Sequence, residues 1–192
     1  MDDRNILVVV DDSWTAAPNW SLRRNVLLAI AEEARLRDRL VYLVTTTEAP
    51  GSRSLESQVV EPKALSVEEF STAISSLEPK SLLPNHQRAA EAIAQLQARH
   101  PGLDVRFLTD GIDHNGIDLL KDKLRQYGGG TTYRSDDEIV VIKGRAKSEA
   151  SEEFSIARTE ASDWSGTLVV TARDGREHGR APIEFQSGDL QT

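Results

Sequence analysis

Hydrophobic positions in the first 135 residues follow two alternating patterns, one typical of buried strands and one of amphipathic helices. Apolar, β-branched runs predict strands at 5–10, 40–46, 105–109 and 131–133. Apolar residues at helical spacing predict helices at 21–37, 66–77, 85–99 and 115–127. Strands that alternate with helices predict an α/β fold, with a doubly wound, mostly parallel sheet of the Rossmann-like kind.

Residues at the ends of these segments indicate where the helices begin. Ser66 and Glu69 have the spacing of a capping box, and Asn85 is a good N-cap for the next helix. Ser21 and Asn115 are expected to cap the first and the last helix. The segment between the second strand and the second helix is expected to be a loop, with an edge strand at 58–60.

The helical pattern stops near residue 136, and only strand patterns follow it. The predicted strands are 139–142, 154–157, 167–172 and 181–185, and Asp174-Gly175 between two of them is typical of a hairpin turn. We therefore predict two domains, an α/β domain at 1–136 and a small β-rich, sandwich-like unit at 137–192. A three- or four-stranded unit of this size is marginally stable alone, so it is expected to pack on the α/β domain or to form part of a sandwich.

Composition excludes several classes of function. The net charge is −8 and no basic stripe is present, which disfavours a nucleic-acid partner. The absence of cysteine excludes disulfides, thiol catalysis and cysteine zinc sites. No apolar run approaches the roughly 18–20 residues that span a bilayer.

Two polar segments follow predicted strands and are the candidates for chemistry. Asp11-Asp12-Ser13-Trp14-Thr15 follows the first strand, and Thr109-Asp110-Gly111-Ile112-Asp113 follows a later one. If these strands are neighbours, their carboxylate and hydroxyl oxygens converge at the edge of the sheet where α/β folds bind ligands. Such oxygens are ligands for Mg²⁺. The alternative is that these aspartates only form turns and caps.

Residues 5–135 resemble a von Willebrand factor A-like domain. The run Ile6 to Thr15 is similar to the family's strand followed by Asp-x-Ser-x-Ser, and Phe107 to Gly111 is similar to its Leu-Thr-Asp-Gly loop. The resemblance implies a metal-ion-dependent adhesion site. Its ligands would be Asp11, Ser13, Thr15 and Asp110. Leu83 falls near the place of a family threonine, which implies a degenerate site with no cofactor or with weak Mg²⁺ or Mn²⁺ binding.

A narrower resemblance rests on Asp11-Asp12-Ser13-Trp14, Trp20 and Arg23-Arg24. These residues are similar to those of bacterial inner-membrane proteins related to the aerotolerance (Bat) operon proteins. That resemblance implies a longer, membrane-anchored protein whose A-like domain lies on the periplasmic side of the inner membrane. A cytoplasmic location is the alternative.

The expected function is that of a non-enzymatic protein-interaction module. The expected contacts with a protein partner are Asp12, Trp14, Asp113 and His114. Trp14 would otherwise cover the edge of the core, and His114 would be a solvated loop residue. The alternatives are a receiver-like signalling domain that uses Asp11 and Asp12, and a phosphatase-type hydrolase. The receiver lacks an aspartate after its third strand, and the phosphatase motif has Ser13 in place of its general acid.

Overall fold

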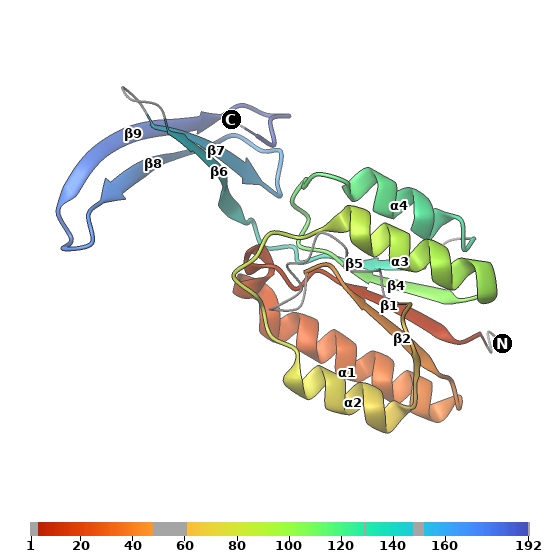
Figure 1. The fold of residues 1–192 in the computed structure, drawn as a ribbon. Helices are drawn as coiled ribbons and strands as arrows, with labels where there is room; N and C mark the ends of the chain where they lie inside the picture. The colour runs from red at the N-terminus through yellow and green to blue at the C-terminus, as the bar shows by residue number, and fades with distance from the viewer. Residues whose placement is uncertain (1–3, 48–60, 129, 148–151, 192) are drawn as a thin grey trace. The chain divides into compact units, whose positions relative to one another are not determined.

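The computed structural model describes residues 4–47, 61–128, 130–147 and 152–191. The chain forms two compact units, Met1–Asp136 and Asp137–Thr192. The first is an α/β unit with a five-stranded, mostly parallel sheet flanked by helices, and the second contains antiparallel hairpins (Figure 1). No helix in the described ranges is long and apolar enough to cross a membrane.

The sheet of the α/β unit has the order β3-β2-β1-β4-β5. Its parallel strands are β1 (Ile6–Val10), β2 (Val41–Thr45), β4 (Asp104–Leu108) and β5 (Gly130–Tyr133). The two-residue β3 (Ala64–Leu65) pairs antiparallel with β2 at the edge. The four predicted strands of this unit are confirmed, whereas the predicted edge strand at 58–60 lies outside the described residues.

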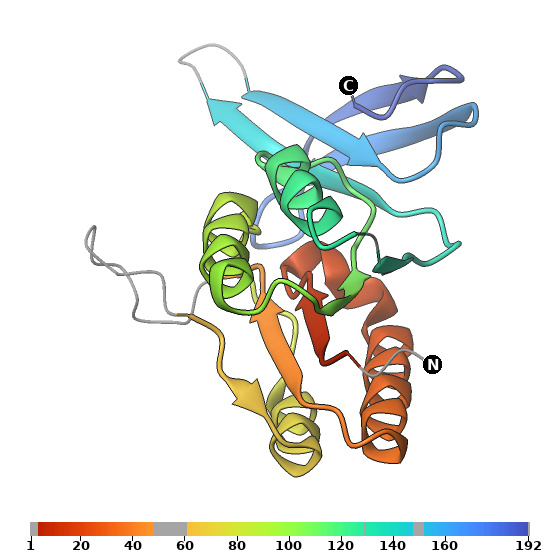
Figure 2. The same cartoon turned by 90° about the vertical axis from the view of Figure 1, so that its right-hand side faces the viewer.

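Helices cover both faces of this sheet. Helices α1 (Trp20–Leu36) and α2 (Val67–Ser76) lie on one face, and α3 (His86–Arg99) and α4 (Ile117–Arg125) lie on the other (Figures 1 and 2). The central strand β1 is wholly buried between them. Its side chains alternate, so that Ile6, Val8 and Val10 pack towards α1 and α2, while Leu7 and Val9 pack towards α3 and α4.

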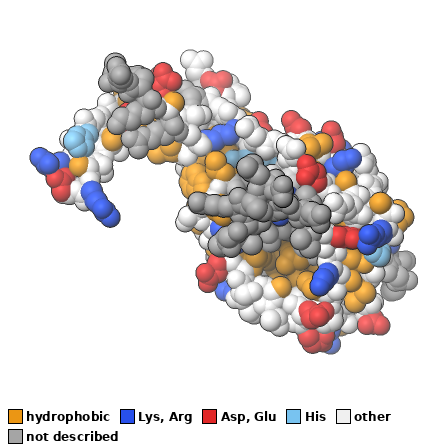
Figure 3. Space-filling view, viewed as in Figure 1, with side chains coloured by type: hydrophobic (Ala, Val, Ile, Leu, Met, Phe, Trp, Pro, Cys, Tyr) orange, Lys and Arg blue, Asp and Glu red, His pale blue; other side chains and the backbone are white. Residues whose placement is uncertain are grey.

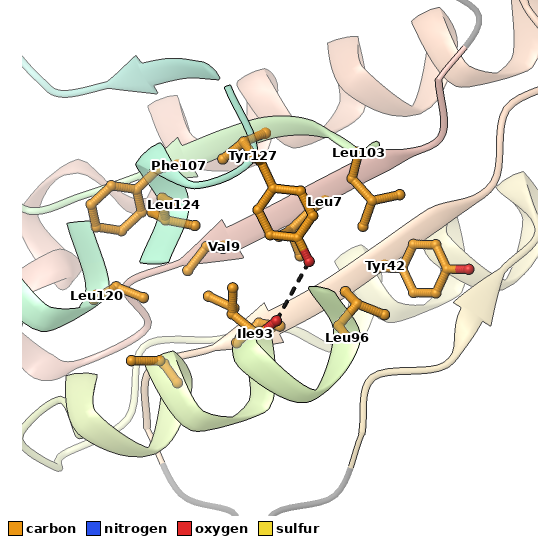
Figure 4. Close-up of a cluster of buried hydrophobic side chains, with 14 of the residues drawn as sticks. Leu7, Val9, Tyr42, Ile93, Leu96, Leu103, Phe107, Leu120, Leu124 and Tyr127 are labelled. Atoms are coloured by element: carbon orange, nitrogen blue, oxygen red, sulfur yellow. Dashed lines mark hydrogen bonds between the residues drawn. The ribbon is translucent and has the colours of Figure 1, made fainter. Parts of the chain in front are cut away.

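Aromatic and aliphatic side chains fill the layer under α3 and α4 (Figure 4). Tyr127, just beyond α4, points its hydroxyl to the carbonyl oxygen of Ile93 at 3.4 Å. Burial, with a smaller contribution from Tyr42, raises the pKa of Tyr127 to about 12. The phenol therefore stays protonated and serves as a hydrogen-bond donor inside this core.

Two predicted helix caps are confirmed and two are wrong. Ser66 and Glu69 form a complete capping box, and the Asn85 side chain accepts the amide of Arg88 at 3.0 Å. Ser21 lies inside α1, because a 3-10 helix, η1 (Trp14–Asn19), runs directly into it.

The other wrong cap is at α4, where Gly116 and not Asn115 holds the N-cap position, with a φ of +81°. A Cβ atom on Gly116 would lie 3.2 Å from the amide nitrogen of Gln87. The close approach of α4 to the start of α3 therefore requires a glycine at this position.

The second unit consists of two antiparallel hairpins, one of β6 (Val140–Lys147) with β7 (Glu152–Arg158) and one of β8 (Trp164–Thr171) with β9 (Glu177–Phe185). All four strands are longer than predicted. The predicted turn at Asp174-Gly175 joins β8 to β9, and Gly175 has a φ of +86°.

Arg158 holds the two hairpins of this unit together. It is almost fully buried, and its guanidinium lies 4.5 Å from the ring centroid of Phe185 on β9. It also donates to the carbonyl oxygens of Gln186 and Asp189, at 3.2 and 2.9 Å. Through Nε and Nη2, Arg158 ties the end of β7 to the chain that follows β9.

At the amino edge of the parallel sheet, a buried ion-pair network joins α1, β1 and β4. Arg39 is only 2% exposed, and it contacts Asp104 at 2.7 Å and Glu33 at 3.0 Å. Asp104 also accepts from Arg106 at 2.7 Å, and the Arg39 Nε donates to the carbonyl oxygen of Arg4. A guanidinium this deeply buried depends on its acidic partners.

We therefore expect Asp104→Ala to lower the free energy of unfolding by about 3–5 kcal/mol, because it leaves Arg39 charged and without its closest acidic partner. Urea unfolding followed by circular dichroism measures this loss. The matched control is Glu32→Ala, which removes a solvent-exposed ion pair with Arg35 and should leave stability unchanged. Equal effects of the two substitutions would contradict the structural role of the network.

Candidate functional site

The structure brings the two predicted acidic segments together at the carboxyl edge of the sheet. Strands β1 and β4 are neighbours, with Val10 opposite Leu108, so Asp11 and Asp110 follow the ends of adjacent strands. The amide of Asp110 donates to Asp11 Oδ2 at 3.2 Å. Both side chains are buried, at 0% and 1% exposed. The convergence expected from the sequence is present, but the acids lie below the surface.

The hydroxyl groups of Ser13, at the N-cap of η1, and of Thr15, within η1, complete this cluster. The Thr15 hydroxyl donates to Asp110 Oδ2, and Ser13 Oγ lies 2.6 Å from Thr15 Oγ1. Because the single hydroxyl proton of Thr15 goes to Asp110, the Ser13 hydroxyl donates to Thr15. Ser13 and Thr15 are both 0% exposed, so the hydroxyls serve an internal network.

Two histidines close the cluster from the α3 and α4 side of the sheet. His86, the first residue of α3, places Nε2 3.1 Å from Asp11 Oδ1. His114 places Nε2 3.2 Å from Asp110 Oδ2 and 3.4 Å from Thr15 Oγ1. The two rings lie 5.9 Å apart between centroids. His86 was not among the predicted site residues, and it is a direct partner of the first buried acid.

The remaining acid, Asp12, is engaged on the other side by Lys80. Lys80 Nζ lies 2.7 Å from Asp12 Oδ2, and the amide of Thr47 donates to Asp12 Oδ1 at 2.8 Å. The backbone reinforces this contact, because the Lys80 amide donates to the carbonyl oxygen of Asp12 at 2.8 Å. Asp12 therefore fastens the loop after α2 to the edge of the sheet.

Arg23, in the first turn of α1, adds a permanent positive charge to the cluster. It is 6% exposed and donates from Nη2 to the carbonyl oxygen of Thr109 at 2.7 Å. Burial lowers its pKa, while the charges of Asp11 and Asp110 act in the opposite direction. Sequence reasoning placed Arg23 only within a resemblance and gave it no role at the site.

The hydrogen bonds around Asp110 decide its protonation state. Burial alone would raise its pKa, but hydrogen bonds from His114, Thr15 and the amide of Ile112 outweigh burial, so the pKa of Asp110 lies below its usual value. The carboxylate is therefore ionised near neutral pH, and these donors take the place of its lost hydration.

The implied metal ligands do not fit a divalent cation in this arrangement. Each carboxylate oxygen of Asp11 and Asp110 already accepts from a histidine, a hydroxyl or a backbone amide. A metal ion needs these oxygens, and Arg23 would repel it. Within the described ranges, no group of three or more His, Cys, Asp or Glu side chains is arranged to hold a metal ion.

The four expected partner contacts differ in their exposure. Asp12 and His114 are buried, so the structure contradicts their expected place on the surface. Trp14 is partly exposed, and Asp113 is exposed in the loop before α4.

The surface beside the acids is formed by other residues. A pocket of about 410 Å³ is lined by Leu82, Leu83, Pro84, Asn85, Gln87, Asn115 and Gly116.

No protein-family model matches this chain, and no curated protein matches it in sequence.

We expect the stabilising contribution of Asp110 to depend on pH. Because its pKa is lowered by folding, the contribution is complete above the ordinary value of about 4 and is lost as the pH falls below it. Asp110→Asn should therefore lower the free energy of unfolding by about 1–3 kcal/mol at neutral pH, and the gap to wild type should shrink in acid.

Urea unfolding at a series of pH values from neutral to acidic measures this gap. Asp113→Asn in the same loop is the matched control for loss of an acidic charge near the surface. A gap for Asp110→Asn that stays constant with pH would show that the ionised carboxylate is not what stabilises the fold.

Proposed function

We propose that the α/β unit is a non-enzymatic protein-interaction module of the doubly wound, von Willebrand A-like kind, with a degenerate metal site. The sheet order β3-β2-β1-β4-β5, with β1 central and the acidic segments after β1 and β4, supports this reading of the fold. The resemblance further implies a longer, membrane-anchored protein that exposes this unit on the periplasmic side, with a cytoplasmic location as the alternative.

The observation that carries this proposal is an apolar lip at the carboxyl edge of the sheet. Leu82 and Leu83 are 39% and 56% exposed, and they line the pocket together with Pro84. Exposed leucines side by side at a concave surface are typical of a protein-binding site. Leu83 is also the residue that departs from the family pattern, so an apolar contact replaces a polar one at this position.

The lining of the pocket indicates the chemistry of the partner. Besides the apolar residues, the described lining contains the amide side chains Asn85, Gln87 and Asn115, and none of these described lining residues is charged. An apolar side chain flanked by peptide groups fits this surface better than a carboxylate does. On the face shown in Figure 3, basic side chains are interspersed with acidic ones, which disfavours a nucleic-acid partner.

The burial of the candidate residues argues against both alternatives, the receiver-like signalling domain and the phosphatase-type hydrolase. A nucleophile or phospho-acceptor must be reached by its substrate, but Asp11, Asp12 and Ser13 are 0% exposed. Asp12 is also held by Lys80 and Thr47 and is not available to bind Mg²⁺. These residues are better explained as the frame that positions the loop carrying Leu82 and Leu83.

Photo-crosslinking at the apolar lip tests the proposal. With p-benzoylphenylalanine at position 83 of the whole chain in its native host, ultraviolet light should give one discrete adduct with a partner protein. Adding Leu82→Asp should reduce this adduct about tenfold, because a charge is placed in the apolar contact.

The matched control carries the same crosslinker at position 36, a leucine that is 70% exposed at the end of α1. The proposal requires that the adduct depends on position 83. No adduct at this position, or the same adduct from position 36, would refute it.

A further inference from the structure

One face of the β8–β9 hairpin is apolar, and an aromatic pair covers one end of it. Half-buried and exposed residues alternate along β8, and Trp164, Leu168 and Val170 lie on the half-buried side. The indole of Trp164 lies over Gly166, where a Cβ atom would collide with it, and meets the Phe185 ring edge-on at 5.9 Å between centroids. The aromatic cover therefore lies at the end of the hairpin that carries Trp164 and Phe185.

Further along the hairpin, the same face borders a groove of about 880 Å³ within the second unit. Small residues of β9 leave room there, because Ala181 and Gly179 lie opposite Leu168 and Val170 in the strand register. A Cβ atom on Gly179 would have no described atom within 4 Å. The other hairpin adds Phe154 of β7 to the lining. The groove is therefore a hollow with apolar walls from both hairpins.

Two apolar side chains of this groove are open to solvent, one from each hairpin. Ile142 on β6 is 44% exposed, and Val169 on β8 is 41% exposed. Single exposed apolar residues are common on protein surfaces, whereas apolar residues gathered at a concave surface are typical of a binding site.

Each hairpin also has a β-bulge beside the groove. The pairing of β6 with β7 skips Lys143, which directly precedes Gly144. The pairing of β8 with β9 skips His178, which directly precedes Gly179. Bulges bend a strand and are frequent at sheet edges and beside functional sites, and Figure 1 shows that β8 and β9 curve together. The two hairpins thus share a device that shapes the strands at the groove.

The strands around the groove have unpaired main-chain edges. Within the described ranges, β6 and β7 form one two-stranded sheet, β8 and β9 form another, and no ladder joins the two. One edge of each strand in the β8–β9 hairpin is therefore without a neighbouring strand. Such an edge can bind an extended peptide through main-chain hydrogen bonds, while adjacent pockets receive its alternate side chains.

Size and charge distinguish between the possible occupants. Eleven described residues line the groove, whereas a stable dimer uses about 20–30 residues on each side. The lining cation Arg180 is paired with Glu177 at 2.9 Å, so its charge is already balanced and does not select an anionic lipid. A short, neutral, extended segment fits both the size of the groove and its charge.

We propose that the second unit binds an extended apolar segment of a partner protein in this groove, as an additional strand at an unpaired edge of the β8–β9 hairpin. The main chain of the segment pairs with that edge. Its alternate side chains pack against Leu168, Val170 and Phe154, which extends the apolar cover that Trp164 and Phe185 provide at the other end. This site belongs to the second unit and is separate from the apolar lip of the α/β unit.

The probe is a capped, fluorescently labelled peptide of eight residues, the length of β8, in which valine alternates with threonine. Fluorescence polarisation measures its binding to the whole chain. The same peptide with proline in place of two threonines should bind at least tenfold more weakly, because proline has no N–H group to pair with a strand.

Gly179→Leu tests the groove itself. The added side chain fills the open space at this position and should weaken peptide binding at least tenfold. The matched control is Gly102→Leu in the α/β unit, where a Cβ atom also has no described atom within 4 Å. Neither glycine has a positive φ, so both variants should fold, and the control should bind the peptide as wild type does.

Val169→Asp is a second variant that does not depend on filling the groove. Its side chain is already exposed, so the fold should tolerate the change, which circular dichroism checks. A charge at this position should weaken peptide binding at least tenfold. Ser165→Asp is the matched control, because Ser165 is an exposed residue of the same strand and is not among the described lining residues.

Several outcomes would overturn the inference. These are a wild-type chain that does not bind the alternating peptide at about 1 mM, equal binding of the proline peptide, and binding that Gly179→Leu and Val169→Asp leave unchanged. Light scattering that shows a dimer for wild type and a monomer for Gly179→Leu would assign the groove to a second copy instead.

A lower unfolding midpoint for Gly179→Leu, together with no peptide binding by wild type, would assign the groove to the α/β unit of the same chain and would also overturn the inference. The crosslinking expected at position 83 does not depend on these results. The two proposals therefore fail independently.

Discussion

A carboxylate can leave water only if opposite charge and hydrogen bonds replace its hydration, and the α/β unit meets this requirement three times at one edge of its sheet. Asp11, Asp12 and Asp110 are all at most 1% exposed. Their partners come from separate elements: Thr15 from η1, His86 from α3 and Lys80 from the loop after α2. The position of each element is therefore tied to the acids that follow β1 and β4.

Much of this architecture is encoded in patterns that can be recognised locally. Apolar runs specify the buried strands, helical spacing specifies the four helices, and strand ends predict that Asp11 and Asp110 converge. The internal cations are different, because a single residue does not reveal which acid it will face. The sequence nonetheless contains a local indication that Arg23 is buried. Arg23 has the helical spacing of Leu27, Ile30 and Ala34, so a charge lies on the apolar face of α1.

The sequence gives the same indication of burial for His86. It precedes Ala89, Ala90 and Ile93 at helical spacing and begins the buried face of α3. Two other features of the fold, the N-cap of α4 and the edge strand β3, were not predicted from the sequence. Gly116 takes the N-cap position of α4 with a φ of +81°, a conformation that L side chains rarely adopt, and the backbone of Gln87 lies close to where its Cβ would be. The edge strand β3 has two residues, which is too short for an alternating pattern to be recognised.

The two ends of the sheet bury arginine in different ways. At the amino edge, Arg39 uses Nε, Nη1 and Nη2 on Arg4, Glu33 and Asp104, so its cost of burial is offset by direct contacts. At the carboxyl edge, Arg23 is bonded through one nitrogen within the described residues, while burial lowers its pKa and the charges of Asp11 and Asp110 favour its charged form. Each unpaired N–H group costs about 1–3 kcal/mol, so the carboxyl edge is the less optimised end. Proteins retain such destabilising features where function requires them. The carboxyl edge of the sheet is also the edge that carries the exposed residues Leu82 and Leu83.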